Sequence, residues 1–127
     1  MPRVLLLLPT TTYRPGAFLC AAARLGVDVT VASEKPNTLA RINPAGLLTL
    51  DFKDPQKAAQ RVMEFSATYP LDAVVPVDSQ GVVLGAAISA ALGLRHNSVE
   101  SATAAACKYR MRQRFQQAGV PSPQFTL

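Results

Sequence analysis

Hydrophobic residues gather in short runs that are separated by longer stretches of mixed character. The run "RVLLLL" at residues 3–8 shows no alternation with polar positions, which is typical of a strand that helices cover on both faces. Three further short runs, rich in leucine or in β-branched residues, follow at 27–33, 47–52 and 71–79. The pattern therefore predicts four strands.

Helix signals fill the stretches between these strands. Pro15 suits the first turn of a helix that ends at Gly26, and Asp54 with Pro55 begins a second helix that runs to residue 69. Residues 36–46 are expected to be irregular or to form a short helical turn. The second helix is expected to turn its apolar positions toward the sheet, and these are Ala58, Ala59, Val62, Met63 and Phe65.

Further helices are predicted in the second half of the chain. One spans 80–94 and is capped by Asp78 or Ser79, and helices at 98–105 and 107–118 follow it. Strands that alternate with helices at this spacing imply crossovers between parallel strands. We therefore predict an α/β fold, a Rossmann-like three-layer domain with a four- to five-stranded parallel sheet.

Length and composition agree with a single globular domain. The chain has 127 residues, of which 49% are hydrophobic, and this content excludes a disordered protein. The apolar run near the N-terminus is halted by Pro9, too early for a signal peptide or a membrane span. The two cysteines lie far apart without metal-ligand spacing, so we expect reduced thiols, a cytoplasmic protein and a core position for Cys20.

The net charge of +5 changes the picture in one place. Four cations fall within seven residues: Lys108, Arg110, Arg112 and Arg114. Such a helix is most often a solvated face, and the other interpretations are a site for nucleotide phosphate and, more weakly, for nucleic acid. We expect no nucleic-acid partner and no membrane partner.

The ends of the predicted strands are where a parallel sheet binds ligands. The loop after the first strand, from Thr10 to Gly16, contains three threonines (Thr10, Thr11 and Thr12) and Arg14 but neither a dinucleotide fingerprint nor a P-loop. Its hydroxyls and guanidinium could hold a carboxylate or a phosphate at the start of the next helix. The alternative is that the threonines satisfy turn and capping hydrogen bonds.

Two carboxylates end other strands. Glu34 could bind a hydroxyl or an amine, or could be a solvated turn residue. Asp78 precedes a helix, so it is a candidate both for the cap and for a ligand contact. The single histidine, His96, has no nucleophile partner nearby, and we predict neither a catalytic constellation nor a metal site in this chain.

The order of the later motifs resembles a known family. "LDAVVPVDSQGVVLGAAISAALGL" followed by "NSVESATAAACKYRMRQRFQQAGVPSPQF" is similar to the N-terminal (pre-ATP-grasp) domain of ATP-grasp ligases and its passage into the ATP-grasp fold. That superfamily includes biotin carboxylase, glycinamide-ribonucleotide ligases and carboxylate-amine ligases. The matching positions are Asp78, "LGL" at 92–94, Lys108, "MR" at 111–112 and "AGVPSP" at 118–123.

This resemblance implies roles for particular residues. Lys108 would contact the phosphates of ATP, although Cys107 stands where the family usually has an acidic residue. Candidates for binding the non-nucleotide substrate are Thr11, Thr12, Arg14, Glu34 and Asp78. The cofactors would be ATP and Mg²⁺ in a longer protein, with neither expected on this chain alone.

The resemblance also implies a division of the chain. Residues 1–97 would form the pre-ATP-grasp domain, and residues 98–127 would be linker helices and a first strand that lead into an ATP-grasp module of the same chain. The longer protein would activate a small-molecule carboxylate as an acylphosphate and couple it to an amine or similar nucleophile, while this chain alone would be inactive. A homodimer is left open.

Two alternatives come from other classes. A free-standing Rossmann or flavodoxin-like nucleotide-binding or regulatory module would pack residues 106–127 onto the sheet. A basic interaction domain would bind nucleic acid with strong salt dependence.

Overall fold

The sheet consists of four parallel strands in a computed structural model that describes residues 1–12 and 14–127. The strands are β1 (Arg3–Leu7), β2 (Asp28–Ser33), β3 (Leu47–Thr49) and β4 (Ala73–Pro76), in the order β3-β2-β1-β4. In the register of the sheet, Leu5 lies between Thr30 of β2 and Val74 of β4. The chain therefore builds the sheet in one direction from β1 to β3 and then returns to the other side of β1.

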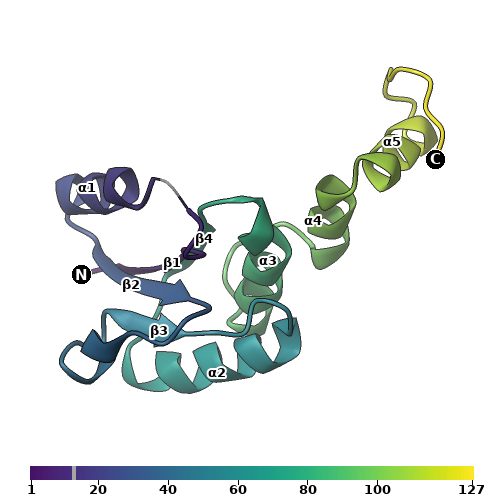
Figure 1. The fold of residues 1–127 in the computed structure, drawn as a ribbon. Coiled ribbons are helices and arrows are strands. Elements are labelled where there is room, and N and C mark those ends of the chain that lie inside the picture. Colours follow the sequence, from purple (N-terminus) through teal and green to yellow (C-terminus); the bar gives the residue numbers. More distant parts are fainter. Residues whose placement is uncertain (13) are drawn as a thin grey trace.

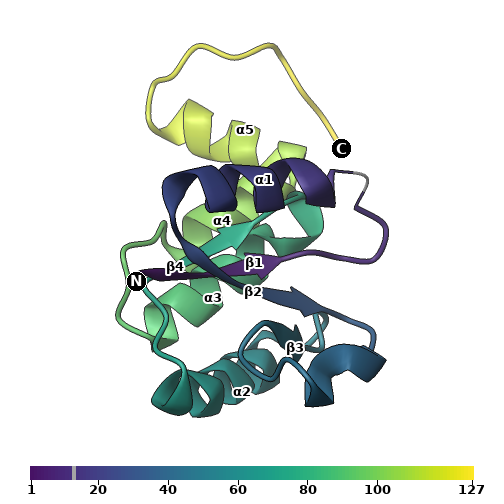
Figure 2. The same ribbon diagram turned by 90° about the vertical axis from the view of Figure 1, so that its left-hand side faces the viewer.

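Helices cover both faces of this sheet, which confirms the predicted three-layer α/β fold. They are α1 (Pro15–Leu25), α2 (Pro55–Thr68) and α3 (Val82–Ala91), with short 3₁₀ turns η1 (Thr38–Arg41) and η2 (Ser79–Gly81). α1 lies on one face, and α2 and α3 lie on the other (Figures 1 and 2). The reversal of direction after β3 explains this split, because crossovers of one hand place helices on opposite faces when the chain moves in opposite directions.

The main core lies between the sheet and the pair α2 and α3. Alternate residues of β1 point into it, and its most buried large side chains include Leu5, Leu7, Val62, Leu84 and Ile88. Each buried aliphatic side chain of this size contributes about 1.5–3 kcal/mol relative to an exposed one. The face under α1 is packed less tightly, because no residue of α1 is buried.

Near the amino ends of the strands, hydrogen bonds of charged and polar groups link neighbouring segments of the sheet. The guanidinium of Arg3 donates to Asp28 Oδ2 over 3.2 Å and to the carbonyl of Ala45 over 3.0 Å. The buried hydroxyl of Thr30 donates to the same carbonyl over 2.7 Å. The backbone N–H of Arg3 donates to Asp72 Oδ2 over 2.8 Å. These bonds join β1 and β2 to the segments before β3 and β4.

We call the sheet with α1, α2 and α3 the body of the domain. Residues 98–127 extend from the body, and we call them the arm. The arm contains α4 (Val99–Ala106) and α5 (Lys108–Gln117), joined at Cys107, whose backbone is extended. α4 packs on α3 and buries Ala102, whereas α5 packs on α4 and projects away from the sheet (Figure 1).

The last residues of the arm fold back along α5. The N–H of Val120 donates to the carbonyl of Phe115 over 2.8 Å, and the ring of Phe125 meets that of Tyr109 edge-on at 5.6 Å between centroids. Residues 120–127 form no strand. The predicted strand at the end of the chain is therefore absent here, because it has no neighbouring strand to pair with.

Other differences from the predicted elements have simple causes. β3 and β4 are shorter than the apolar runs at 47–52 and 71–79, and the runs extend beyond the strands because Leu50 and Leu71 contribute to the core from outside the ladder. Met63 is half exposed and Cys20 is exposed, so the core positions predicted for both were wrong. Each lies on a helix face that no other element covers closely.

Helix ends follow the predicted signals. Gly26 ends α1 in the left-handed conformation at φ 65°, and the side chain of Asp54 accepts a bond from the N–H of Lys57 at the start of α2. Ser98 caps α4 in the same way through the N–H of Ser101. Within the described part of the chain, no helix combines the length and apolar character needed to cross a membrane.

Candidate functional site

The topology creates a switch point at the carboxyl edge of the sheet. β1 lies beside β4, and the chain leaves β1 for α1 on one face of the sheet but leaves β4 for α3 on the other face. In open parallel sheets, ligands bind outside the carboxyl ends of the strands at such a point. The loops that follow β1, β2 and β4 all begin at this edge, so their side chains are the first candidates for a site.

Glu34, just after β2, binds the loop that follows β1. The backbone N–H of Thr10 donates to both carboxylate oxygens, over 3.1 Å each, and the hydroxyl of Thr10 donates to Oε1. These bonds, chiefly that of the Thr10 hydroxyl, hold the pKa of the Glu34 carboxyl below its usual range. Glu34 is exposed to solvent and is a carboxylate at neutral pH.

Asp78, after β4, holds the same loop from the other side. The hydroxyl of Thr12 donates to Asp78 Oδ2 over 2.9 Å, while the N–H of Gln80 donates to Oδ1 over 3.0 Å. Asp78 therefore caps η2 and binds the loop across the switch point at once. The two interpretations of this residue, a cap and a site residue, are compatible with each other in the structure.

A tight turn explains why Thr10 and Thr12 bind different carboxylates. The N–H of Thr12 donates to the carbonyl of Pro9 over 2.9 Å, which closes a turn over residues 9–12. Thr10 and Thr12 consequently reach carboxylates on opposite sides of β1, and Thr11 is exposed at the tip of the turn. We call Thr10, Thr12, Glu34 and Asp78 the edge cluster.

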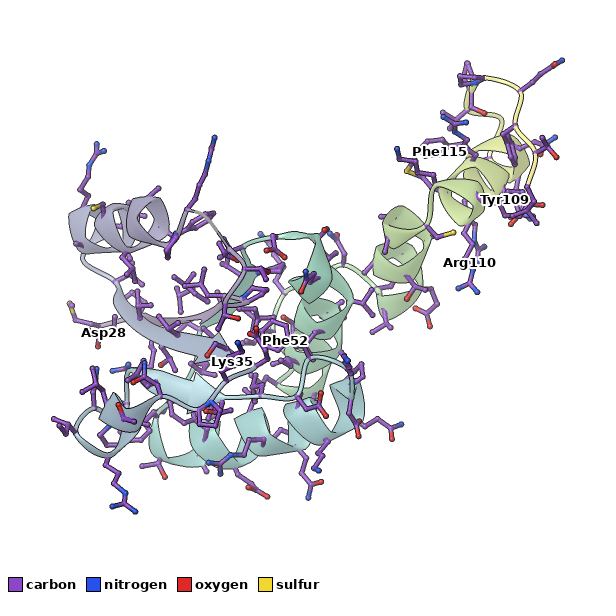
Figure 3. The ribbon with its side chains drawn as sticks, in the orientation of Figure 1. Asp28, Lys35, Phe52, Tyr109, Arg110 and Phe115 are labelled. Carbon is purple, nitrogen blue, oxygen red and sulfur yellow. The ribbon has the colours of Figure 1, made fainter. Side chains whose placement is uncertain are left out.

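The edge cluster is rich in hydrogen-bond acceptors. An ionised carboxylate offers about four acceptor positions, so each of the two retains lone pairs after binding its threonine. Lys35 follows Glu34 and is exposed at the end of β2 (Figure 3). This arrangement suits the hydroxyl or amine part of a ligand at the carboxylates.

A profile of the ATP-grasp N-terminal domain matches residues 19–96 of the chain. The chain belongs to this family. The match includes Glu34 and Asp78, and it ends before the arm. A search of the curated proteins gave no match.

Two solved structures share the fold. The L-amino acid ligase from Bacillus licheniformis superposes with a TM-score of 0.77 at 19% identity, over 97% of this chain and 32% of that one. The phosphoribosylglycinamide synthetase from Anaerococcus prevotii gives a TM-score of 0.72 at 20% identity, over 95% of this chain and 30% of that one. This ATP-grasp N-terminal domain thus spans about a third of the length of either protein.

The domain does not bring all of the predicted site residues together. Thr12 binds Asp78, and Glu34 binds the same loop through Thr10, whereas Thr11 is exposed at the tip of the turn and Arg14 is exposed at the position that precedes α1. Lys108 is exposed at the first position of α5, on the arm and away from the sheet edge (Figure 1).

Thr10 belongs to the loop predicted to bind substrate, but it was not among the individual residues chosen as candidates. Its position directly after Pro9, at the end of the first apolar run, was the available signal. A turn that directs alternate residues to opposite sides could not be inferred from three consecutive threonines, because each of them has the same turn propensity.

Among the residues that the structure describes, no group of three or more His, Cys, Asp or Glu side chains could hold a metal ion. Cys20 and Cys107 are both free thiols.

Proposed function

We propose that this domain helps to bind the non-nucleotide substrate of an ATP-dependent ligase. The ligase would activate a carboxylate as an acylphosphate and couple it to an amine or similar nucleophile. The observation that carries the proposal is the family match over residues 19–96. The two solved neighbours, named as an L-amino acid ligase and a phosphoribosylglycinamide synthetase, agree with this class of reaction.

In the proposed reaction, an oxygen of the substrate carboxylate attacks the terminal phosphorus of ATP, and the bond from that phosphorus to the ADP oxygen breaks. The amine then attacks the acyl carbon, inorganic phosphate leaves, and the nitrogen loses a proton. Such chemistry depends mainly on positioning and on neutralising phosphate charge.

Each part of this chain would contribute differently. Glu34 and Asp78 would orient the hydroxyl or amine part of the non-nucleotide substrate, held in place by Thr10 and Thr12. Lys108 would supply a compact positive charge to a phosphate. A metal would neutralise further phosphate charge, but the described residues do not fit one, and we assign no step of this chain to it.

Exposure of both sites supports the expectation that the chain alone is inactive. Glu34 and Lys108 are exposed, and phosphoryl transfer to a carboxylate needs a site from which water is excluded. Cys107 occupies the position that precedes α5 and makes no side-chain cap bond, so Lys108 has no acidic neighbour in sequence to steer it.

The free-standing nucleotide-binding module is less well supported. That alternative expects residues 106–127 to pack onto the sheet. α5 instead packs on α4 and buries none of its residues. This geometry favours a domain that is completed by another part.

Calorimetric titration with ATP separates the two proposals. We expect the 127-residue chain to bind ATP weakly or not at all, because Lys108 is its single assigned phosphate contact. Micromolar affinity would favour the free-standing module and would count against the ligase fragment.

A second experiment tests the role of Lys108 in a longer protein, if the reading frame continues for about 200 residues as domain sizes require. In that protein, Lys108→Ala should weaken ATP binding, and Lys53→Ala, an exposed lysine after β3, should not. Unchanged affinity in Lys108→Ala would remove this residue from the nucleotide site.

A further inference from the structure

A pocket beside β4 is left unexplained by the proposed substrate and nucleotide contacts. It has a volume of ≈ 500 Å³, which is within the range of small-molecule sites, and it lies between the edge strand β4, the helices α3 and α4, and residues 95–97 of the segment that joins these helices. Most of its lining residues fall within residues 1–97, so the pocket belongs to the domain itself and not to the exposed face of α5. We call it the α3–α4 pocket.

Small side chains make room for this pocket. α4 packs directly beside α3 (Figure 1). At the pocket, however, α3 contributes Gly85 and Ala86, α4 contributes Ala102, and β4 contributes Val74 and Pro76. Side chains as short as these leave the space between the two helices unfilled, and they give the pocket an apolar part.

A buried hydroxyl of α3 faces the pocket. Ser89 lines the pocket and is only 3% exposed, and its side chain has no hydrogen-bond partner among the described residues. By contrast, Thr103 of α4 donates to the carbonyl of Val99, four residues earlier, over 2.7 Å. No polar side-chain atom of the described residues is both fully buried and without a partner, so the Ser89 oxygen must open into the pocket. A hydroxyl in this position is unfavourable when unpaired, and a bound ligand would satisfy it.

The charge of the lining residues indicates the class of ligand. Arg95 lines the pocket and forms no ion pair within the described chain, and no Asp or Glu lines the pocket. Glu100, the carboxylate closest to Arg95 in sequence, lines the grooves between α4 and α5 instead. The pocket therefore offers one uncompensated positive charge.

The two residues that follow Arg95 add hydrogen-bonding groups. Nδ1 of His96 donates to the carbonyl of Asn97 over 2.6 Å, which orients the imidazole ring. The side-chain amide of Asn97 has no partner among the described residues and provides two N–H donors. Arg95, Asn97 and Ser89 thus supply donors for an anionic group beside the apolar part of the pocket.

From these observations we propose that the α3–α4 pocket binds a small monocarboxylate with an apolar tail. Arg95 would pair with the carboxylate, Ser89 would donate to a ligand oxygen, and the tail would lie against Val74 and Pro76. One guanidinium balances the single charge of a carboxylate, whereas a phosphate monoester carries about −1.5 to −2. The pocket shares no residue with the edge cluster, and the proposal does not depend on the proposed ligase reaction.

Matched small molecules test this proposal. The probes are 4-methylpentanoate, its neutral analogue 4-methylpentanamide, and monobutyl phosphate, each titrated into the 127-residue chain and followed by amide chemical shifts. We expect 4-methylpentanoate to shift the amides of Ser89, Asn97 and Ala102 with a dissociation constant of about 1 mM or below, which a ligand of about eight non-hydrogen atoms can reach. It should bind at least about tenfold more tightly than the amide, and this preference should shrink as salt is added.

Matched variants assign the contacts. Arg95→Gln should weaken 4-methylpentanoate by about tenfold and remove its preference over the amide, whereas Arg24→Gln, at an exposed arginine of α1, should change neither. Ser89→Ala should weaken the carboxylate by about threefold to tenfold because it removes one hydrogen bond. Ser66→Ala in α2 is its control and should have no effect. Alanine is a better helix former than serine, so Ser89→Ala should keep the fold, which the remaining amide shifts verify.

Several results would overturn the proposal. They are equal binding of the carboxylate and the amide, shifts confined to residues outside the pocket, and unchanged affinity in Arg95→Gln. The absence of shifts at a concentration about tenfold above the expected dissociation constant would also overturn it. Tighter binding of monobutyl phosphate than of 4-methylpentanoate would assign the pocket to phosphate esters in place of carboxylates.

Discussion

The body and the arm of this domain each contain a ten-residue helix, and the two helices differ in how much of their surface is buried. α3 presents Leu84 and Ile88 to the sheet, and both are essentially inaccessible to solvent. α5 has comparable length but contacts α4 and its own tail, and it buries no residue. The difference shows that a helical sequence indicates a local structure, whereas the surface it packs on decides whether that structure is stable by itself.

The two regions also differ in how they treat charge. In the body, Arg3 pairs with Asp28, and the carboxylates of Glu34 and Asp78 accept bonds from Thr10 and Thr12. In the arm, the cations of α5 are uncompensated within the described chain. Exposed cations of the body such as Lys53 and Lys57 also lie outside these ion pairs, so the two regions differ in that the arm concentrates four cations on one short helix.

The largest expected effect comes from removing a core side chain. Ile88→Ala should lower the free energy of unfolding by about 2–5 kcal/mol, because it leaves a cavity between α3 and the sheet. Met111→Ala in the arm should cost less than about 1 kcal/mol, because Met111 is only partly buried. Urea denaturation followed by circular dichroism measures both, and equal losses would remove the distinction between body and arm.

A smaller effect is expected at the edge cluster. Thr12→Val removes the hydroxyl that donates to Asp78 and should cost about 1 kcal/mol. Thr11→Val is the matched control, since Thr11 is exposed at the tip of the same turn and should change little. If the two substitutions cost the same, the turn does not direct Thr12 to the carboxylate as described.

The smallest effect concerns pH. The lowered pKa of Glu34 means that its bonds to Thr10 stabilise the folded state above about pH 4.3, the ordinary pKa of glutamate, and that this stabilisation is lost as the pH falls through the lowered value. Between pH 7 and pH 3, the wild type should therefore lose more stability than Glu34→Gln.

Glu64→Gln provides the control for this measurement. Glu64 is exposed and lies 3.8 Å from Arg61, so its loss should leave the pH dependence close to that of the wild type. A profile for Glu34→Gln that parallels the wild type would show that Glu34 makes no special contribution.

The sequence predicted the architecture because the fold depends on patterns that are local. The unbroken apolar run of β1, the glycine after α1 and the Asp-Pro start of α2 each mark an element without knowledge of its neighbours. Tertiary packing decided the rest: Met63 and Cys20 have apolar character, but they lie on helix faces that remain exposed.

The candidate site could be predicted only in part for a similar reason. Glu34 and Asp78 were identifiable because strand ends are ligand-binding positions in parallel sheets. Which threonine reaches which carboxylate depends on the turn closed by Thr12 and Pro9, and on the strand order that places β4 beside β1. The separation of Lys108 from this edge depends on the direction of the arm, which no local pattern determines.

Hydrogen exchange of the backbone amides tests most directly the central claim, that the body is stable by itself and that α5 lacks the packing that would stabilise it. We predict the slowest exchange in β1 and α3, at the rate of global unfolding, and exchange at least about a hundredfold faster in α5, because short helices without buried contacts open locally. Protection of α5 equal to that of β1 in the chain alone would contradict the account.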